Sequence, residues 1–177
     1  MRVKKDRSNE LDFRIDKLTN SITNVVSGDS FDTNVSLLTS LDLKLVTKKT
    51  GWLFNWRTEF NDPIKEAYKL TIVNSPRVIQ GLISVTIESD HVFMNLLENA
   101  PFNLGKKKVY EGVAGNLVAY ACKLSFQRGF EGFVAFDAKT ALISHYEKTL
   151  GAYHYKGQRM IIRTRESKIL TEKYFKY

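Results

Sequence analysis

The hydrophobic period of this chain changes once, after Pro101, and the change separates a strand-rich part from a part in which helices and strands alternate. Before it, apolar side chains alternate with polar ones along residues 68–72, 78–87 and 91–97, and short polar turns separate these runs. Alternation with a period of two is typical of β-strands, and short turns join antiparallel neighbours. We therefore expect three antiparallel strands. One face of the third is expected to carry Val92, Met94 and Leu96.

After Pro101 the apolar residues recur every three to four positions from Val113 to Ser125, which indicates a helix, and Gly129 suits its left-handed end. Downstream we expect a strand over 133–136, a helix capped by Thr140 and ended by Gly151, a strand over 160–162 and a short helix in the charged C-terminal tail, 166–177. The sequence thus predicts an α/β (α+β) fold with a mixed, mostly antiparallel central sheet and helices on both faces.

Length and composition favour one soluble domain. The chain has 177 residues, 43% of them hydrophobic, which is enough for one well-buried core, so we expect a single domain over 1–177 with a variable N-terminal part, 1–60. No leader peptide or membrane-spanning run is recognisable, and the single cysteine, Cys122, cannot form an internal disulfide. We expect a cytoplasmic protein without a membrane partner.

The formal net charge of +8 favours a partner that carries phosphate groups. The excess lies mainly in residues 61–177, which hold seventeen Lys and Arg against eleven Asp and Glu. A nucleotide cofactor and a nucleic acid both satisfy this charge, and so do lysines that simply face water. No recognition-helix or RNP-type motif favours nucleic acid, although the aromatic residues over 52–56 could stack bases; a buried hydrophobic cluster is the alternative for them.

A glycine-rich turn at 111–117 precedes the strongest helix. Glycine lets the backbone approach a ligand closely, and the free N–H groups of a first helical turn favour a pyrophosphate. The spacing is neither that of the dinucleotide-binding fingerprint nor that of Walker A. Glycines that only permit close helix packing would look the same, so the turn alone leaves both interpretations open.

This turn, the helix to Gly129, the strand through Phe136 and the segment His145-Tyr-Glu-Lys-Thr-Leu-Gly-Ala152 resemble, in order and spacing, the two core motifs of the GNAT acetyltransferase superfamily. The resemblance covers roughly 97–152. It implies acetyl-CoA as cosubstrate, with pyrophosphate on the loop amides and pantetheine beside the third strand. The implied cofactor-binding residues are Leu97, Lys108, Gly112, Val113, Ala114, Gly115, Asn116 and Leu117.

The chain departs from the family pattern in three places. Val109 stands where the family has a polar residue, an extra stretch spans 101–110, and Ala152 replaces a phenylalanine in the final signature. The extra stretch contains Lys106-Lys107-Lys108, which either adds affinity for phosphate or is a solvated loop.

Two residues are expected to be catalytic. Tyr146 resembles the family's tyrosine that protonates the CoA thiolate, whereas a core aromatic is the alternative. Glu98 ends the third strand and can accept a proton from the amine if it faces the cleft; otherwise it is an ordinary strand-end carboxylate. His145 points away from Tyr146 around a helix and is expected to be a surface or partly hydrogen-bonded residue.

The resemblance therefore predicts an N-acetyltransferase that moves acetyl directly from acetyl-CoA to a primary amine. The acceptor is open among a small amine, a peptide amino group and an aminoacyl-tRNA, and so is the oligomeric state. One cysteine and three scattered histidines give no metal-ligand spacing, so we expect no metal. The alternatives are a GNAT-like protein that binds acyl-CoA without turnover and a basic nucleic-acid-binding protein.

Overall fold

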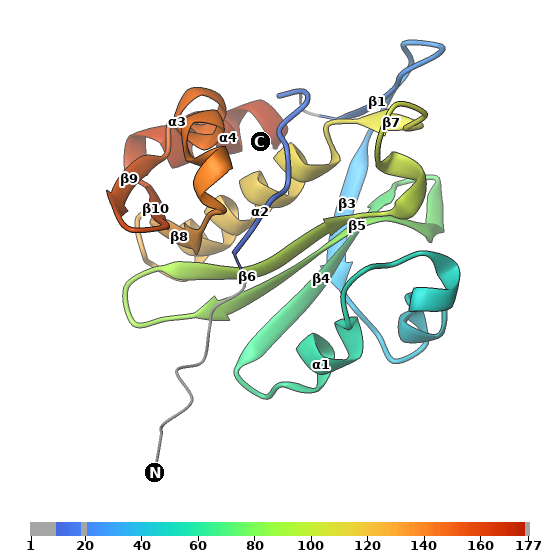
Figure 1. The fold of residues 1–177 in the computed structure, drawn as a ribbon, viewed down its shortest axis with the longest axis horizontal. Coiled ribbons are helices and arrows are strands. Elements are labelled where there is room, and N and C mark those ends of the chain that lie inside the picture. Colours follow the sequence, from blue (N-terminus) through green and yellow to red (C-terminus); the bar gives the residue numbers. More distant parts are fainter. Residues whose placement is uncertain (1–9, 19–20, 176–177) are drawn as a thin grey trace.

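A computed structural model describes residues 10–18 and 21–175, and its main feature is a strongly twisted seven-stranded sheet (Figure 1). The strand order is β3-β4-β5-β6-β8-β10-β9, and every neighbouring pair is antiparallel except β6 and β8. The strands are β3 Thr33–Leu37, β4 Lys65–Ile72, β5 Ser75–Ile87, β6 Val92–Asn99, β8 Val134–Asp137, β9 Tyr153–Lys156 and β10 Arg159–Ile162. The predicted mixed, mostly antiparallel sheet is confirmed.

A small second sheet lies beside the N-terminal end of the longest helix. It has the order β2-β1-β7, with β1 Ile22–Asn24, β2 Ser30–Phe31 and β7 Tyr110–Glu111. Because β7 immediately precedes Gly112, this sheet fixes the backbone that enters the glycine-rich turn.

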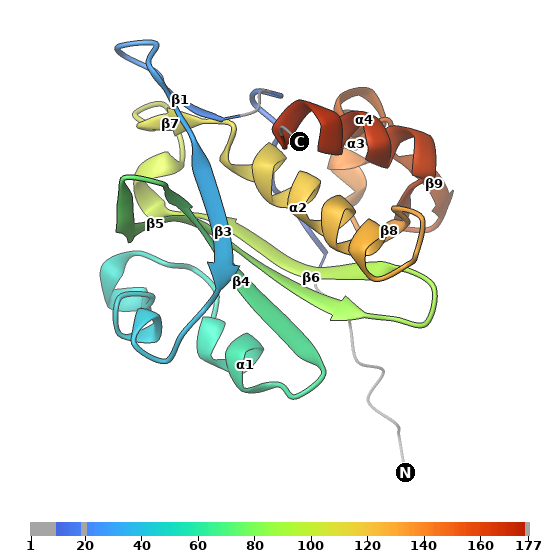
Figure 2. The ribbon, with the colours of Figure 1, turned by 180° about the vertical axis from the view of Figure 1, so that it is seen from behind.

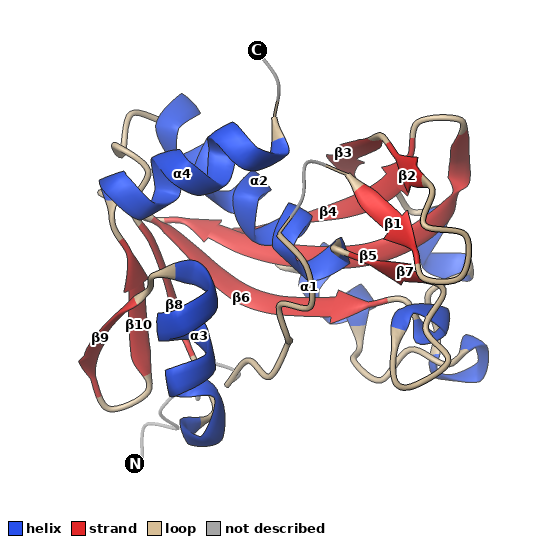
Figure 3. Cartoon of the chain, turned by 90° about the horizontal axis from the view of Figure 1, so that it is seen from above, coloured by secondary structure: helices blue, strands red, loops and turns tan. Residues whose placement is uncertain are grey.

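Helices cover both faces of the large sheet, as predicted. They are α1 Trp56–Asn61, α2 Val113–Gln127, α3 Ile143–Leu150 and α4 Thr164–Tyr174, with 3₁₀ turns at Asp42–Lys44, Lys48–Thr50, Pro101–Asn103 and Thr140–Leu142. Figure 2 shows α2 and α4 side by side over one face, and Figure 3 shows α3 over the β8–β10 part of the sheet. Helix α1 and the first two 3₁₀ turns cover the other face, where a second hydrophobic cluster forms around Trp52 and Trp56.

A bulge in β6 sets the faces of its side chains. Ser84 pairs with Leu96 but Val85 pairs with Met94, so Asn95 is the extra residue. The expected face of Val92, Met94 and Leu96 is therefore wrong: Leu97 joins the first two in the core under α2, whereas Leu96 lies in the cluster under α1. After the bulge, each side chain of β6 therefore lies on the face opposite to the one predicted.

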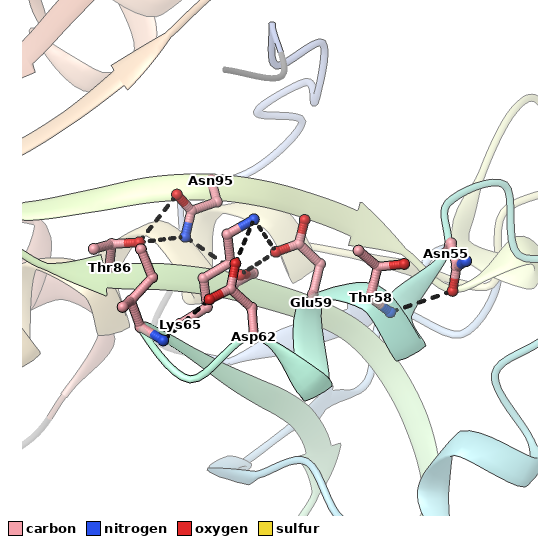
Figure 4. A network of polar contacts seen from close by, with 9 residues as sticks. Asn55, Thr58, Glu59, Asp62, Lys65, Thr86 and Asn95 are labelled. Carbon is pink, nitrogen blue, oxygen red and sulfur yellow. Dashed lines mark hydrogen bonds and ion pairs between the residues drawn. The ribbon is translucent and has the colours of Figure 1, made fainter. Parts of the chain in front are cut away.

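Polar groups tie α1 to the strands beneath the bulge (Figure 4). Asn95 exchanges hydrogen bonds with Thr86, with Asn95 Nδ2 lying 2.9 Å from Thr86 Oγ1. Glu59, only 4% exposed, accepts a hydrogen bond of 2.9 Å from the Ser84 hydroxyl and pairs with Lys65 at 2.9 Å. This network satisfies a buried carboxylate, so it fixes the position of α1 on the sheet.

Two expectations about the C-terminal part change. Strand β9 was not predicted, because its four residues, Tyr153–Lys156, are all exposed and include no aliphatic side chain. Thr140 does not cap α3 but lies in the 3₁₀ turn before it, where its hydroxyl accepts a hydrogen bond from Gln158. The predicted helix of the charged tail exists as α4, and it docks on α2 through Leu170 and Tyr174, both buried.

None of the helices in the described part of the chain is long and apolar enough to cross a membrane.

Candidate functional site

Strands β6 and β8 separate soon after they meet, and the chain's own N-terminal segment enters between them. The two strands pair in parallel at Val92 with Val134 and at Phe93 with Ala135. Residues 10–18, which we call the N-terminal strap, then lie against β8: Leu11 N–H donates to Asp137 O at 2.7 Å, and Leu11 O accepts from Lys139 N–H at 3.0 Å. Because β10 occupies the other edge of β8, the strap lies on the side that β6 has left.

Alternate residues of the strap fill this space. Leu11, Phe13 and Ile15 are 3%, 7% and 7% exposed and belong to the core cluster under α2. The Phe13 ring lies with its centroid 4.7 Å from that of Tyr146 and 5.8 Å from that of Phe136. In Figure 1 the strap is the dark blue trace that rises past β6 toward the start of α2. The strap therefore fills the space between β6, β8, α2 and α3, which we call the groove.

The hydroxyl of Tyr146 points into this groove. The side chain is fully buried on α3, and its Oη donates to the backbone carbonyl of Phe13 at 2.6 Å. Burial, with a smaller contribution from the nearby Asp12 carboxylate, raises the pKa of Tyr146 above its ordinary value. The phenol is therefore neutral at physiological pH and is held as a hydrogen-bond donor.

His145 binds the strap two residues further along, at Ile15. Its Nε2 accepts a hydrogen bond of 2.9 Å from the backbone N–H of Ile15. Partial burial, and then the charge of Arg14, lower the pKa of His145 below its ordinary value. The expectation of a partly hydrogen-bonded histidine is confirmed, and its partner is the strap.

A side-chain carboxylate of the chain itself lies at the N-terminal end of α2. Gly112 is the N-cap residue with φ of +94°, which a side chain would strain, and it offers no side-chain cap of its own. The carboxylate of Asp16 accepts from Gly112 N–H at 3.0 Å through Oδ1 and from Lys108 Nζ at 3.0 Å through Oδ2. The predicted loop and one lysine of the run thus bind a negative group together, although this group belongs to the chain itself.

The other loop residues serve packing. Val113 and Leu117 press against β5, where a Cβ on Gly81 would lie 2.7 Å and 3.0 Å from their side chains. Ala114 is 1% exposed. The amide of Asn116 donates to Gly112 O at 2.7 Å, and its oxygen accepts from the Thr33 hydroxyl at 3.1 Å.

Gly115 faces α4 and the strap. A Cβ at Gly115 would overlap the hydroxyl of Tyr174 and lie 3.1 Å from the carbonyl of Lys17. That hydroxyl donates to the same carbonyl at 3.1 Å. Close packing, the alternative that the sequence left open, therefore explains Gly115, whereas Gly112 forms part of the anion site.

Leu97 and Glu98, near the end of β6, lie on opposite faces of the sheet. Leu97 is buried under α2. Glu98, 5% exposed, points to the α1 side, where its carboxylate accepts from Leu53 N–H at 2.8 Å, from Phe54 N–H at 3.4 Å and from the Trp56 indole N–H at 2.8 Å. Glu98 thus fixes the loop that enters α1.

The aromatic residues of this loop mostly form a core. Trp52 and Trp56 are 5% and 1% exposed, whereas Phe54 is 36% exposed. The buried hydrophobic cluster, the alternative to base stacking, is confirmed for the two tryptophans.

Two hollows of the described surface lie away from the predicted site residues. One, of about 560 Å³, lies beside β8 and β10 and is lined by His91, Glu131 and Arg159 among others. The other, of about 340 Å³, lies on the α1 side between Trp52 and Phe102. The groove between β6 and β8 is not hollow because the strap fills it.

Within residues 10–18 and 21–175, no three His, Cys, Asp or Glu side chains are grouped closely enough to hold a metal ion.

Comparison with known proteins identifies the fold. The sequence matches no model of a protein family and no curated protein. Among solved structures, the ribosomal-protein-S18-alanine N-acetyltransferase from Escherichia coli has a TM-score of 0.52 at 13% identity, covering 74% of this chain and 94% of that one. A spermidine N-acetyltransferase SpeG chimera from Vibrio cholerae and hSSAT has a TM-score of 0.55 at 15% identity, covering 76% and 98%.

A third similar structure was solved with acetyl coenzyme A bound. A protein of Bacillus anthracis, assigned as a streptothricin acetyltransferase and solved with acetyl coenzyme A, has a TM-score of 0.50 at 12% identity, covering 76% of this chain and 96% of its own. At these identities the likeness establishes the architecture. This chain has the fold of the GNAT N-acetyltransferases, as the sequence predicted.

Proposed function

We propose that this chain, a protein with the GNAT fold, transfers an acyl group from acyl-coenzyme A, with acetyl-CoA as the expected donor, to a primary amine. One observation carries the proposal: Gly112 N–H, Lys108 Nζ and Tyr146 Oη all contact the same short strap. Residues that the sequence assigns to phosphate binding and to proton donation therefore line a single groove. Solved relatives in fold include N-acetyltransferases and a complex with acetyl-CoA.

The anion end of the groove fits the phosphates of a coenzyme A. A carboxylate already accepts hydrogen bonds there from Gly112 and Lys108. Phosphate oxygens accept from the same donors, and the dipole of α2 favours either anion. Lys108 supplies the charge that the missing polar residue at Val109 would otherwise contribute.

The other end of the groove supplies a proton. When an amine displaces coenzyme A, the leaving thiolate needs a proton or a hydrogen bond. Tyr146 is neutral because burial raises its pKa, and its hydroxyl is directed into the groove. Cys122 does not provide a covalent route, since it is fully buried within α2 and burial raises the pKa of its thiol to about 12. These features support direct transfer.

Glu98 is the proposed proton acceptor for an amine that approaches from the α1 side of β6, because its carboxylate lies on the face opposite to Leu97 and the core under α2. Its carboxylate has about four acceptor positions, and residues 53–56 use three of them. One position therefore stays available for an amine or a bridging water. The same carboxylate fixes the loop beside the second hollow, so chemistry and loop position are coupled at this residue.

Release of coenzyme A tests the proposal. The purified chain is mixed with acetyl-CoA and a panel of primary amines that includes spermidine and a peptide with an N-terminal alanine, the substrates named for two proteins of similar fold. Free thiol is then measured. Acetyl-CoA at a hundred times its dissociation constant should stabilise the fold by about 2.7 kcal/mol. Absence of any thermal shift at millimolar acetyl-CoA would contradict the proposal.

The occupied groove favours a second candidate, acyl-CoA binding without turnover. The strap crosses the site beside Tyr146, where an amine and a thioester would have to meet. Acetyl-CoA binding without thiol release for any amine would support this candidate over the enzyme.

A further inference from the structure

The N-terminal strap is bound in the way that a ligand is bound. Its backbone pairs in parallel beside the end of β8 at Leu11, its carbonyl at Phe13 accepts from Tyr146, and its amide at Ile15 donates to His145. Its apolar side chains point into the core while Asp12 and Arg14 face solvent. Extended segments that add to a sheet edge use this combination of main-chain hydrogen bonds and alternate side-chain pockets.

The strap ends in a group that resembles phosphate in charge and in hydrogen bonding. Asp16 places one carboxylate oxygen on the N–H of Gly112 and the other on the ammonium of Lys108. Asp16 accepts from the N–H of Gly112, the N-cap residue of α2, although the two residues lie 96 positions apart in the sequence. A carboxylate at this place is stabilised by the same helix dipole and charge that would stabilise a pyrophosphate.

From these contacts we propose that residues 10–18 are an intramolecular competitor of acyl-CoA, and that the cosubstrate binds only when the strap leaves the groove. The inference rests on the proposed function. Three contacts of the strap, at Lys108, Gly112 and Tyr146, fall on groups that the proposed function assigns to acyl-CoA. The single N–H of Gly112 and the single O–H of Tyr146 cannot serve the strap and a second ligand at once, so binding of one excludes the other.

This arrangement makes the strap a regulatory element. The apparent dissociation constant of acyl-CoA equals the intrinsic constant divided by the fraction of molecules in which the groove is open. Any event that holds the strap outside the groove raises that fraction. The exposed ion pair of Asp12 with Lys139, at 2.7 Å, contributes little to the stability of the closed state. Burial of Phe13 and the hydrogen bond of Asp16 to Gly112 contribute more.

The test compares acetyl-CoA affinities by isothermal titration calorimetry in the full-length chain. The double variant Phe13→Ala, Asp16→Ala should bind acetyl-CoA at least tenfold more tightly than the wild type, because both groups that hold the strap are gone. Asp12→Ala is the matched control on the same segment. It should change the affinity less than twofold, since its side chain is exposed and lies outside the groove.

Hydrogen exchange of the unmodified chain gives a second, independent readout. Acetyl-CoA should speed exchange of the amides of Leu11 and Ile15 while it slows exchange at 112–117. Equal affinities in all three proteins, or strap amides that stay protected when acetyl-CoA is bound, would overturn the competition. Failure of the folded wild type and the folded double variant alike to bind acetyl-CoA would instead refute the proposed function itself.

Discussion

At the residue scale, substitution of Tyr146 gives the most direct test of the proposed chemistry. Tyr146→Phe keeps the ring that packs on Phe13 and Phe136 and removes only the hydroxyl. Turnover should fall about ten- to a thousandfold, as expected for loss of a general acid. Stability should fall by about 1 kcal/mol, because the buried carbonyl of Phe13 loses its donor.

Kinetics and melting are measured on the same preparation of Tyr146→Phe, and acetyl-CoA affinity should not weaken. Wild-type turnover in a folded variant would show that Tyr146 is only a packing residue.

Glu98 combines two roles that Glu98→Gln separates. A glutamine keeps one oxygen but presents an NH₂ group to at least one of the three N–H donors of residues 53–56, so the free energy of unfolding should fall by about 1–3 kcal/mol. If Glu98 also accepts the proton, turnover should drop about a hundredfold and the pH dependence of kcat/KM should lose its acidic limb. A lower melting temperature with an unaltered pH profile would leave Glu98 as a positioning residue for the loop.

The contact of His145 with the strap makes stability depend on pH. The pKa of His145 is lowered in the folded chain, first by burial, so the unfolded chain binds the proton more strongly. The contribution is complete above about pH 6.5, the ordinary value, and is lost as the pH falls through the folded pKa. Protonation removes the acceptor for Ile15 N–H, and the resulting charge faces Arg14.

Chemical denaturation between pH 8 and pH 5 measures this contribution. His145→Gln, which keeps an acceptor that does not titrate, should lose less stability than the wild type over this interval. Equal losses in the two proteins would show that His145 does not couple the strap to pH.

At the scale of elements, α2, α4 and the strap meet at one glycine. In Gly115→Ala the new Cβ would overlap the Tyr174 hydroxyl, so α4 must move and the free energy of unfolding should fall by about 1–3 kcal/mol. The double variant Gly115→Ala, Tyr174→Phe removes the overlapping atom. It should therefore be more stable than the sum of the two single effects predicts, in a double-mutant cycle measured by denaturant.

Additive effects of Gly115→Ala and Tyr174→Phe would contradict the contact. Hydrogen exchange of the single variant Gly115→Ala should also show faster exchange in Thr164–Tyr174 than in β4 or β5, because the new Cβ displaces α4 and does not touch those strands.

The elements that the sequence predicted correctly are those whose pattern is local. Strands β4 and β5 lie between the two hydrophobic clusters and helix α2 packs on one of them, so their runs of apolar side chains are visible in the sequence. The bulge at Asn95 was not predicted, because an extra residue changes facing without changing composition. The exposed strand β9 was not predicted because it has no buried face.

The sequence singled out only those candidate site residues that lie in or beside the family motifs. The GNAT resemblance singled out Gly112, Lys108 and Tyr146, which the fold does bring to one groove. It gave no reason to expect the strap. The alternation of residues 11–16 was a local signal for an extended segment, but its partners lie about 90 to 135 positions away and are fixed by tertiary contact alone.

At the scale of the whole molecule, the two hydrophobic clusters share one sheet. The core under α2 and the cluster under α1 draw their side chains from opposite faces of β4, β5 and β6. Both clusters rest on the same hydrogen-bonded strands. If these strands separate under one cluster, the other cluster loses its support as well. We therefore expect the sheet and α2 to unfold as one cooperative unit, with the strap and the ends of the chain opening at lower free energy.

Cys122 reports on that unit, because it is the only cysteine of the sequence and is fully buried in α2. Burial raises the pKa of its thiol to about 12, so in the folded chain the reactive thiolate is both scarce and inaccessible. Alkylation by iodoacetamide should then require global unfolding. The opening free energy from labelling rates should equal that from equilibrium denaturation and should fall with denaturant along the same slope. Variants that free the strap should lower this value by as much as they lower the free energy of unfolding, since Phe13 and Ile15 belong to the same core cluster as Cys122. Labelling with a much smaller free energy and no denaturant dependence would contradict the single unit and indicate that α4 leaves α2 in a local opening.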